Sequence, residues 1–293
     1  MKIGIYGQPN NKITKKYVYY LIDIFKKKNI EFLFEEKFYT YLKGDNPNIS
    51  YEVFKDYYDL NSSFDIFFSV GGDGTFLRSI TLVRDSNIPI IGINTGRLGF
   101  LATIQKDDME SAVNMLIKKE YTIQKRALLK VTTNEDIEEL KDLNFALNEI
   151  SISRKNTASM ITVETYLDDE YLTTYWSDGL IISTPTGSTG YSLSCGGPII
   201  SPGSKNLALT PIAPHSLSVR PLVIPIKTKI EIKVDSRANE ALLTLDSRVI
   251  TITNKTKIII EKNEFSIKTV QLNNRSFIKT LREKLLWGED KRN

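Results

Sequence analysis

The chain has 293 residues, of which 41% are hydrophobic and 25% charged, a composition typical of a folded globular protein rather than a disordered one. Lys and Arg number 39 and Asp and Glu 35, and so small an excess of basic residues, without a basic run, argues against nucleic acid as a partner. No apolar run approaches the roughly 18 residues of a membrane-spanning helix. We therefore expect a cytoplasmic protein that binds no membrane.

The single cysteine, Cys195, and the single histidine, His215, exclude an internal disulfide and any site built from several cysteines or histidines. The chemistry of the protein must then come from carboxylates, hydroxyls and backbone amides.

The first third of the chain predicts strands that alternate with helices. Strands are expected at 2–6, 30–34, 65–70 and 89–93, and helices at 18–25, 76–84 and 108–118. The run 65–70 is continuously apolar, which is typical of a strand buried on both faces of a parallel sheet. This alternation predicts an open, Rossmann-like α/β sheet.

The pattern changes after about residue 126. Ile230, Ile232 and Val234 alternate with polar residues, as in half-buried antiparallel strands, and Asp168-Asp169 predicts a turn. We expect an α/β domain at 1–125 and a β-rich, β-sandwich-like domain at 126–269, although a β-rich extension of one domain fits the same pattern. The segment 270–293 contains helical spacing at 276–287 and is expected to pack back on the first domain.

A glycine-rich loop, Gly71-Gly72-Asp73-Gly74-Thr75, follows the buried strand 65–70 and opens a helix. Glycines let the backbone approach an anion, and the helix amino terminus attracts it. A carboxylate repels phosphate, so Asp73 needs another task, such as accepting a proton from an attacking hydroxyl or holding a magnesium ion. The alternative is a tight turn in which Asp73 only caps the helix.

A second loop, 184–192, contains five Ser and Thr residues, two glycines and Tyr191. Hydroxyls and amides of this kind can donate to phosphate and ribose oxygens, and Tyr191 offers a face to an aromatic ring. Asp178 and the pair Asn148-Glu149 supply acceptors suited to ribose hydroxyls. A polar surface loop and satisfied polar pairs at strand ends are the alternatives.

Together, the glycine loop, Asn148-Glu149 and the segment 178–194 resemble the NAD kinase family. The segment 214–222 also resembles a motif of that family, so the resemblance spans nearly the whole chain. It implies an enzyme that transfers the γ-phosphoryl of ATP to the 2′-hydroxyl of the adenosine ribose of NAD, forming NADP and ADP. It also implies Mg²⁺, or another divalent cation, with ATP, and a homodimer or homotetramer.

The resemblance assigns roles to particular residues. It implies Asp73 as the general base, and it implies no protein ligand for a metal. Phe100 is expected to lie against the adenine, and His215 to touch the nicotinamide ribose or a phosphate, unless it makes only a structural hydrogen bond. The implied NAD-binding residues are Gly74, Phe100, Asn148, Glu149, Asp178, Thr189, Gly190, Tyr191, Ser194 and His215. The implied phosphate- and ATP-binding residues are Gly71, Gly72, Thr75 and Arg78.

Two other functions remain compatible with these residues. Diacylglycerol and sphingosine kinases share the glycine loop, so the acceptor could be another hydroxyl compound such as a lipid. A non-catalytic dinucleotide sensor could use the same pocket. The polar loop at 184–194 argues against a lipid acceptor, and the presence of Asp73 argues against a sensor.

Overall fold

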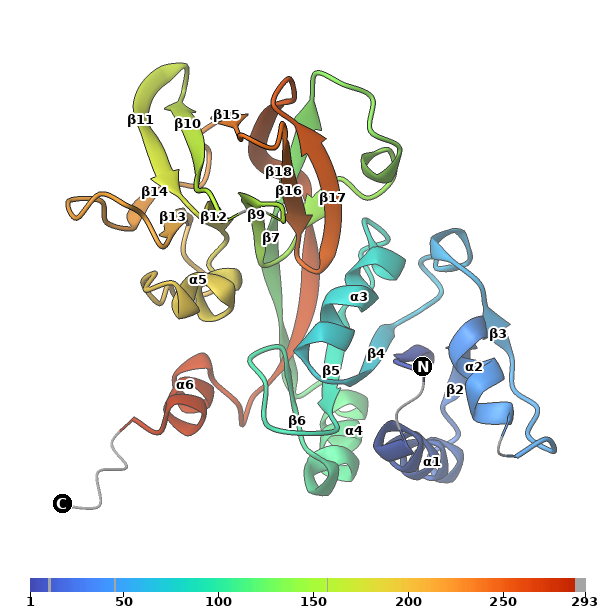
Figure 1. The fold of residues 1–293 in the computed structure, drawn as a ribbon. Coiled ribbons are helices and arrows are strands. Elements are labelled where there is room, and N and C mark those ends of the chain that lie inside the picture. Colours follow the sequence, from blue (N-terminus) through green and yellow to red (C-terminus); the bar gives the residue numbers. More distant parts are fainter. Residues whose placement is uncertain (10–11, 45, 157, 288–293) are drawn as a thin grey trace. The chain divides into compact units, whose positions relative to one another are not determined.

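The structure, a computed structural model, describes residues 1–9, 12–44, 46–156 and 158–287 (Figure 1). The chain divides into two compact units, Met1–Lys125 with Ile267–Asn293 (unit 1) and Arg126–Ser266 (unit 2). Each boundary falls inside a long strand, β7 (Tyr121–Thr133) or β18 (Lys257–Leu272). Of the expected C-terminal segment, residues 288–293 lie outside the described residues.

Unit 1 is built on a parallel sheet in the order β5-β4-β1-β2-β3, with β6 and β18 also paired in parallel to β5. All six residues of β4 are buried, as the apolar run predicted. The strands are β1 (Lys2–Gly7), β2 (Glu31–Glu35), β3 (Val53–Phe54), β4 (Ile66–Gly71), β5 (Ile90–Asn94) and β6 (Ala102–Ile104).

The helices of unit 1 cover this sheet through apolar faces. Buried residues of α1, α2 and α4 join those of β1 and β4 in one core, because apolar side chains recur at helical spacing in each helix. The helices are α1 (Lys12–Lys27), α2 (Glu36–Lys43), α3 (Asp73–Val83), α4 (Met109–Ile117) and α6 (Phe277–Leu285). Helix α3 begins at Asp73, earlier than the expected 76, because Gly72 serves as its N-cap.

The C-terminal helix α6 packs back on unit 1, as predicted. Lys284 Nζ donates to the carbonyl oxygen of Leu98 at 2.6 Å, and the rings of Phe100 and Phe277 lie 6.3 Å apart. Arg275, just before the helix, forms an ion pair of 2.6 Å with Asp108. In the described part of the chain, no helix has the length and apolar character needed to cross a membrane.

Unit 2 contains two antiparallel sheets around one apolar core. The first has the order β14-β13-β12-β9-β16-β17, and in the second β11-β10-β15-β18 are paired in that order. Asp168 and Asp169 form the β10–β11 turn with φ of 50° and 69°, as the sequence predicted. The other strands are β8 (Phe145–Ala146), β9 (Glu149–Arg154), β10 (Ile161–Leu167), β11 (Glu170–Ser177), β12 (Gly179–Ser183), β13 (Asn206–Ile212), β14 (Leu222–Pro225), β15 (Ile230–Asp235), β16 (Glu240–Leu245) and β17 (Arg248–Thr253).

Candidate functional site

The glycine turn of unit 1 connects β4 to α3. A Cβ on Gly71 would lie 2.2 Å from Thr75 Oγ1, whereas a Cβ on Gly72 or Gly74 would meet nothing within 4 Å. Gly72 and Gly74 are exposed, so their backbone is open to a ligand at the helix amino terminus. Thr75 is buried against Gly71, and we assign it to the packing of the turn as well as to the phosphate loop.

The carboxylate of Asp73 is held by three backbone N–H groups. Oδ2 accepts from Phe100 at 2.8 Å, and Oδ1 accepts from Leu101 at 3.1 Å and from Ala102 at 2.9 Å. Gly72 rather than Asp73 is the N-cap of α3, and the Asp73 carboxylate accepts from the 100–102 backbone rather than from the first turn of the helix, so the alternative that Asp73 only caps the helix is wrong. The three donors fix the position of the carboxylate and leave one of its roughly four acceptor positions for another partner.

The loop that supplies these donors is shaped by Asn94, at the end of β5. Its amide nitrogen donates to the carbonyl oxygens of Arg97 at 2.7 Å and Ala102 at 3.1 Å, and its Oδ1 accepts from Gly96 N at 2.7 Å. Gly99 passes so close to Asp73 that a Cβ there would lie 2.0 Å from Oδ1. The two strand-end loops of unit 1 therefore meet at Asp73.

Arg78 lies one turn into α3 and is exposed. Its guanidinium lies within electrostatic range of the hydroxyl of Tyr6, in β1. Burial raises the pKa of Tyr6, and the negative charge of Glu35 adds to this effect, whereas the charge of Arg78 opposes it. Arg78 thus places a positive charge on the helix that the glycine turn opens.

In unit 2, the Asn148-Glu149 pair carries polar atoms without partners. Asn148 Oδ1 and Glu149 Oε2 are both buried and make no hydrogen bond with any described group. Burial, followed by the nearby charge of Asp246, raises the pKa of Glu149 to about 8. A Cβ on Gly190 would lie 3.3 Å from Glu149 Oε2, which places the backbone of the hydroxyl-rich loop directly beside this pair. Buried polar atoms of this kind are satisfied by a ligand or by water.

The hydroxyls of the 184–192 loop mostly stabilise the loop itself. Thr184 Oγ1 donates to Leu147 O at 2.6 Å, Ser188 Oγ donates to Pro185 O at 2.8 Å, and Ser192 Oγ bonds Thr210 Oγ1 at 2.8 Å. These three residues are fully buried, so the interpretation that they donate to a ligand is wrong. Thr189 and Gly190 are partly exposed, and Tyr191 and Ser194 are exposed.

The remaining predicted residues of unit 2 lie at the ends of β11 and β13. Asp178 Oδ1 forms an ion pair of 3.0 Å with Arg154 Nε. Trp176 and His215 have ring centroids 4.5 Å apart, and His215 N donates to Trp176 O at 2.8 Å. Burial raises the pKa of Tyr191, and the charges of Cys195, Asp178 and Glu149 raise it further. Tyr191 therefore lies within electrostatic range of both carboxylates.

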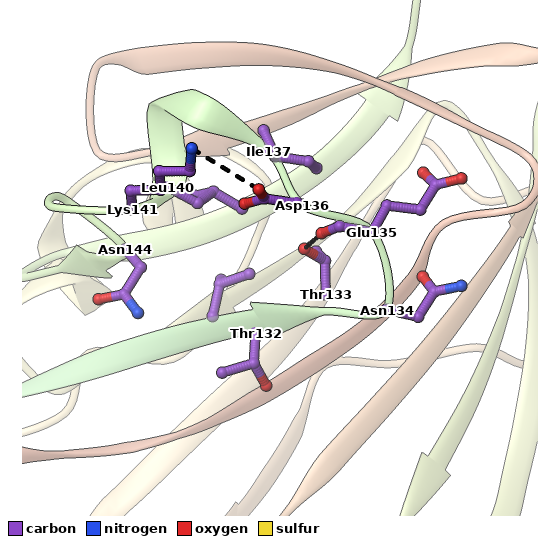
Figure 2. A pocket seen from close by; sticks show the side chains of 10 residues that line it. Thr132, Thr133, Asn134, Glu135, Asp136, Ile137, Leu140, Lys141 and Asn144 are labelled. Atoms are coloured by element: carbon purple, nitrogen blue, oxygen red, sulfur yellow. Dashed lines mark hydrogen bonds and ion pairs between the residues drawn. The ribbon is translucent and has the colours of Figure 1, made fainter.

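Figure 2 shows a separate hollow in unit 2, with a volume of about 400 Å³. It is lined by residues between Val131 and Asn144, none of which is a predicted site residue. Two of its charged groups, Lys141 and Asp136, pair with each other at 3.6 Å, and Glu135 accepts a hydrogen bond from Thr256 at 2.7 Å. We assign no role in substrate binding to this hollow.

Three residues that shape the two sites were missed in the sequence. Gly99 allows the close approach to Asp73, and Gly187 has no room for a Cβ, which would lie 2.1 Å from Asn148 O. Asp246 accepts hydrogen bonds from the backbone of the Asn148-Glu149 pair. Gly187 lies inside the hydroxyl-rich loop 184–192, whereas Asp246 lies in a different hairpin and carried no sequence signal of its own.

The fold and the two sites define a class of protein with two units. One is an α/β unit with a carboxylate beside a glycine turn, and the other is a β-sandwich unit with buried acceptor atoms that have no hydrogen-bond partner. Residues 3–121 match the model of the ATP-NAD kinase N-terminal domain, and residues 147–272 match that of the ATP-NAD kinase C-terminal domain. The chain belongs to the ATP-NAD kinase family. It is 53% identical to NAD kinases of Flavobacterium psychrophilum, over 295 residues, and Christiangramia forsetii, over 294 residues, with 100% of each chain covered.

A solved structure supports the same relationship. An NAD kinase from Archaeoglobus fulgidus in complex with ATP matches with a TM-score of 0.73 and 26% identity, covering 97% of this chain and 99% of the other. The predicted family and fold class are thereby confirmed.

Proposed function

We propose that the chain catalyses the transfer of the γ-phosphoryl group of ATP to the 2′-hydroxyl of the adenosine ribose of NAD. The relatives at 53% identity are NAD kinases over their whole length. The observation that carries the proposal in the structure is the Asp73 carboxylate, fixed by three backbone N–H groups beside an open glycine turn. Phosphoryl transfer depends mainly on positioning and charge stabilisation, which these groups can supply.

Asp73 acts in this proposal as the general base. Its remaining acceptor position takes the hydrogen bond of the 2′-hydroxyl and then the proton, as the hydroxyl oxygen attacks phosphorus. The three N–H donors hold the carboxylate in place, so little reorganisation is needed at the moment of reaction. The Gly72 and Gly74 backbone at the amino terminus of α3 holds the phosphates, with Arg78 as a further positive charge.

Unit 2 binds the dinucleotide in this proposal. Asn148 Oδ1 and Glu149 Oε2, which lack partners, accept hydrogen bonds from the adenosine end of NAD. Asp178 and His215 take the nicotinamide end, and Tyr191 lies against the ligand. The other residues of this surface are Thr189, Gly190 and Ser194.

A divalent cation that arrives with ATP fits these residues. Within the described ranges, no group of three or more His, Cys, Asp or Glu side chains could hold a metal ion by itself. Mg²⁺ is usually bound through substrate phosphates and few protein ligands. We therefore propose that the phosphates carry the ion, that the Gly72 and Gly74 amides hold those phosphates, and that the ion neutralises phosphate charge.

We further propose that the protein is cytoplasmic and forms a homo-oligomer.

The test is to incubate the purified chain with ATP, Mg²⁺ and NAD and to detect NADP with an NADP-specific dehydrogenase. Asp73→Asn should lower the rate by about a thousandfold or more, while NAD still binds, because the amide cannot accept the proton. Asp59→Asn is the matched control: its carboxylate also accepts a backbone N–H, from Lys55 at 2.7 Å, but lies outside the glycine loop.

The outcomes separate this function from its alternatives. NAD binding without any NADP formation, with ATP or with polyphosphate, would favour a sensor. Phosphorylation of diacylglycerol but not of NAD would favour a lipid kinase. An Asp73→Asn variant that retains most of its activity would exclude Asp73 as the base.

A further inference from the structure

Asp246 occupies the tip of the hairpin between β16 and β17, far in sequence from the predicted site. Its φ is 54°, in the left-handed region that glycine and asparagine favour. Aspartate tolerates this conformation better than most residues do, and the Asp246 carboxylate makes a defined contact from it.

The contact is to the backbone that precedes β9. Asp246 Oδ2 accepts from Leu147 N at 2.9 Å, and Oδ1 accepts from Asn148 N at 2.7 Å and from Glu149 N at 3.3 Å. Asp246 N in turn donates to Glu149 O at 3.0 Å. Burial raises the pKa of the Asp246 carboxyl, and these N–H groups and the charge of Arg248 oppose that shift. One carboxylate therefore binds three successive amides.

The other side of the same segment is bound by the hydroxyl-rich loop. Thr184 Oγ1 donates to Leu147 O at 2.6 Å, and Thr184 N donates to Asn148 O at 2.9 Å. The backbone of 147–149 is thus fixed on both sides, while Asn148 Oδ1 and Glu149 Oε2 remain without partners. Every printed hydrogen bond of the Asp246 carboxylate is to a backbone N–H group, and Asp246 acts on the Glu149 side chain only through its charge, which raises the pKa of that group.

We propose that Asp246 is a positioning residue for NAD: its carboxylate fixes the backbone of 147–149 so that the Asn148 and Glu149 side chains face the adenosine end of the dinucleotide. This inference rests on the proposed binding of NAD by that pair. It assigns Asp246 no contact with the substrate. Its removal should therefore weaken NAD binding in molecules that are folded, with little effect on ATP.

Asp246→Asn is the informative variant because it keeps the size of the side chain. An amide has one acceptor oxygen, and its NH₂ group would face backbone N–H donors that now have no acceptor. The loss of a hydrogen bond to a charged acceptor corresponds to a change of about ten- to a hundredfold in an equilibrium constant. We expect the dissociation constant for NAD, measured by calorimetry without ATP, and the KM for NAD to rise by about that factor. The KM for ATP should change less than about threefold.

Asp168→Asn is the matched control. Asp168 is also an aspartate at a hairpin tip with positive φ, 50°, and its Oδ1 accepts from Lys229 N at 2.9 Å. Its contact is outside the 147–149 segment, so the affinity for NAD should stay at the wild-type value. A purely structural defect lowers the fraction of active molecules, and hence the apparent kcat, but leaves the KM of the folded molecules unchanged.

Each outcome decides the inference. A wild-type dissociation constant for NAD in folded Asp246→Asn overturns it, even when NADP formation by the wild-type chain supports the proposed function. A wild-type chain that binds no NAD overturns both. If the variant does not fold, amide hydrogen exchange of the wild-type chain is the test: Leu147, Asn148 and Glu149 should exchange as slowly as central β9, and rapid exchange overturns the inference.

Discussion

Replacing Gly99 by alanine should displace the Asp73 carboxylate, the proposed general base, without altering any charged group. A Cβ on Gly99 would lie 2.0 Å from Asp73 Oδ1, 2.6 Å from Cγ and 2.9 Å from Oδ2. Non-bonded carbon and oxygen atoms pack at about 3.4 Å or more, so the loop or the carboxylate must shift by more than about 1 Å. Either movement breaks the bonds from the Phe100, Leu101 and Ala102 amides.

The size of the effect follows from the role of position in phosphoryl transfer. A displacement of about 1 Å can cost a factor of about a hundred in rate, and this corresponds to about 2.7 kcal/mol of transition-state stabilisation. We therefore expect kcat to fall about a hundredfold in Gly99→Ala. The KM for NAD should change little, because the proposed NAD-binding side chains of unit 2 keep their positions.

The assay is NADP formation at saturating ATP and NAD, with thermal unfolding measured in parallel. Gly96→Ala is the control from the same loop, because its Cβ would meet only Asn94 Oδ1 at 3.9 Å, an ordinary contact, and it keeps the N–H that Asn94 binds. Gly99→Ala with a kcat within about threefold of wild type would refute the requirement for a fixed carboxylate. An equal loss in both variants would show that the loop tolerates no side chain at all.

Three further predictions concern Glu149, Gly187 and the metal. Burial raises the pKa of Glu149 to about 8, above the usual 4.5 of a glutamate side chain, so the folded chain binds this proton more tightly than the unfolded chain. The free energy of unfolding should then fall by up to about 5 kcal/mol as pH rises from about 4 to about 9, and Glu149→Gln should flatten that part of a profile of urea denaturation against pH. Gly187→Ala should lower the free energy of unfolding by about 1–3 kcal/mol, because its Cβ would lie 2.1 Å from Asn148 O; an unchanged melting temperature would contradict this. Removal of Mg²⁺ by a chelator should stop NADP formation but leave the melting temperature unchanged, and added Mg²⁺ should restore the activity.

Much of the α/β part of the fold was predictable because most of its elements carry a local pattern, whereas helix α2 and the short strands β3 and β6 were not predicted. The buried strand β4 is continuously apolar and ends in glycines, and both features are properties of neighbouring residues. The turn at Asp168-Asp169 was predictable for the same reason, since aspartate tolerates positive φ. The start of α3 was misplaced by three residues, because glycines in the first turn hide the helical pattern.

The site was predictable only as a set of residue types. The motif identified Asp73 and the Asn148-Glu149 pair, but not the groups that hold them, because those contacts join distant parts of the chain. The amides on Asp73 come from residues 27 to 29 positions further on. The carboxylate that accepts from the backbone N–H of Asn148 belongs to Asp246, 98 positions further along the chain. Backbone donors carry no residue identity, so no pattern of side chains could reveal them.

The two sites differ in how their polar groups are satisfied, and the difference agrees with their proposed tasks. A base must keep one position through the reaction, and Asp73 is held by three donors that leave a single acceptor position open. Polar groups discriminate most strongly between ligands when a wrong ligand leaves them buried without a hydrogen bond. Asn148 Oδ1 and Glu149 Oε2 are buried without partners, as such a task requires. Because such atoms cost stability in the free protein, the backbone that carries them needs support of its own. Asp246 and Thr184 supply this support from opposite sides of the segment, which holds its backbone in place although the proposed NAD-binding atoms have no partners.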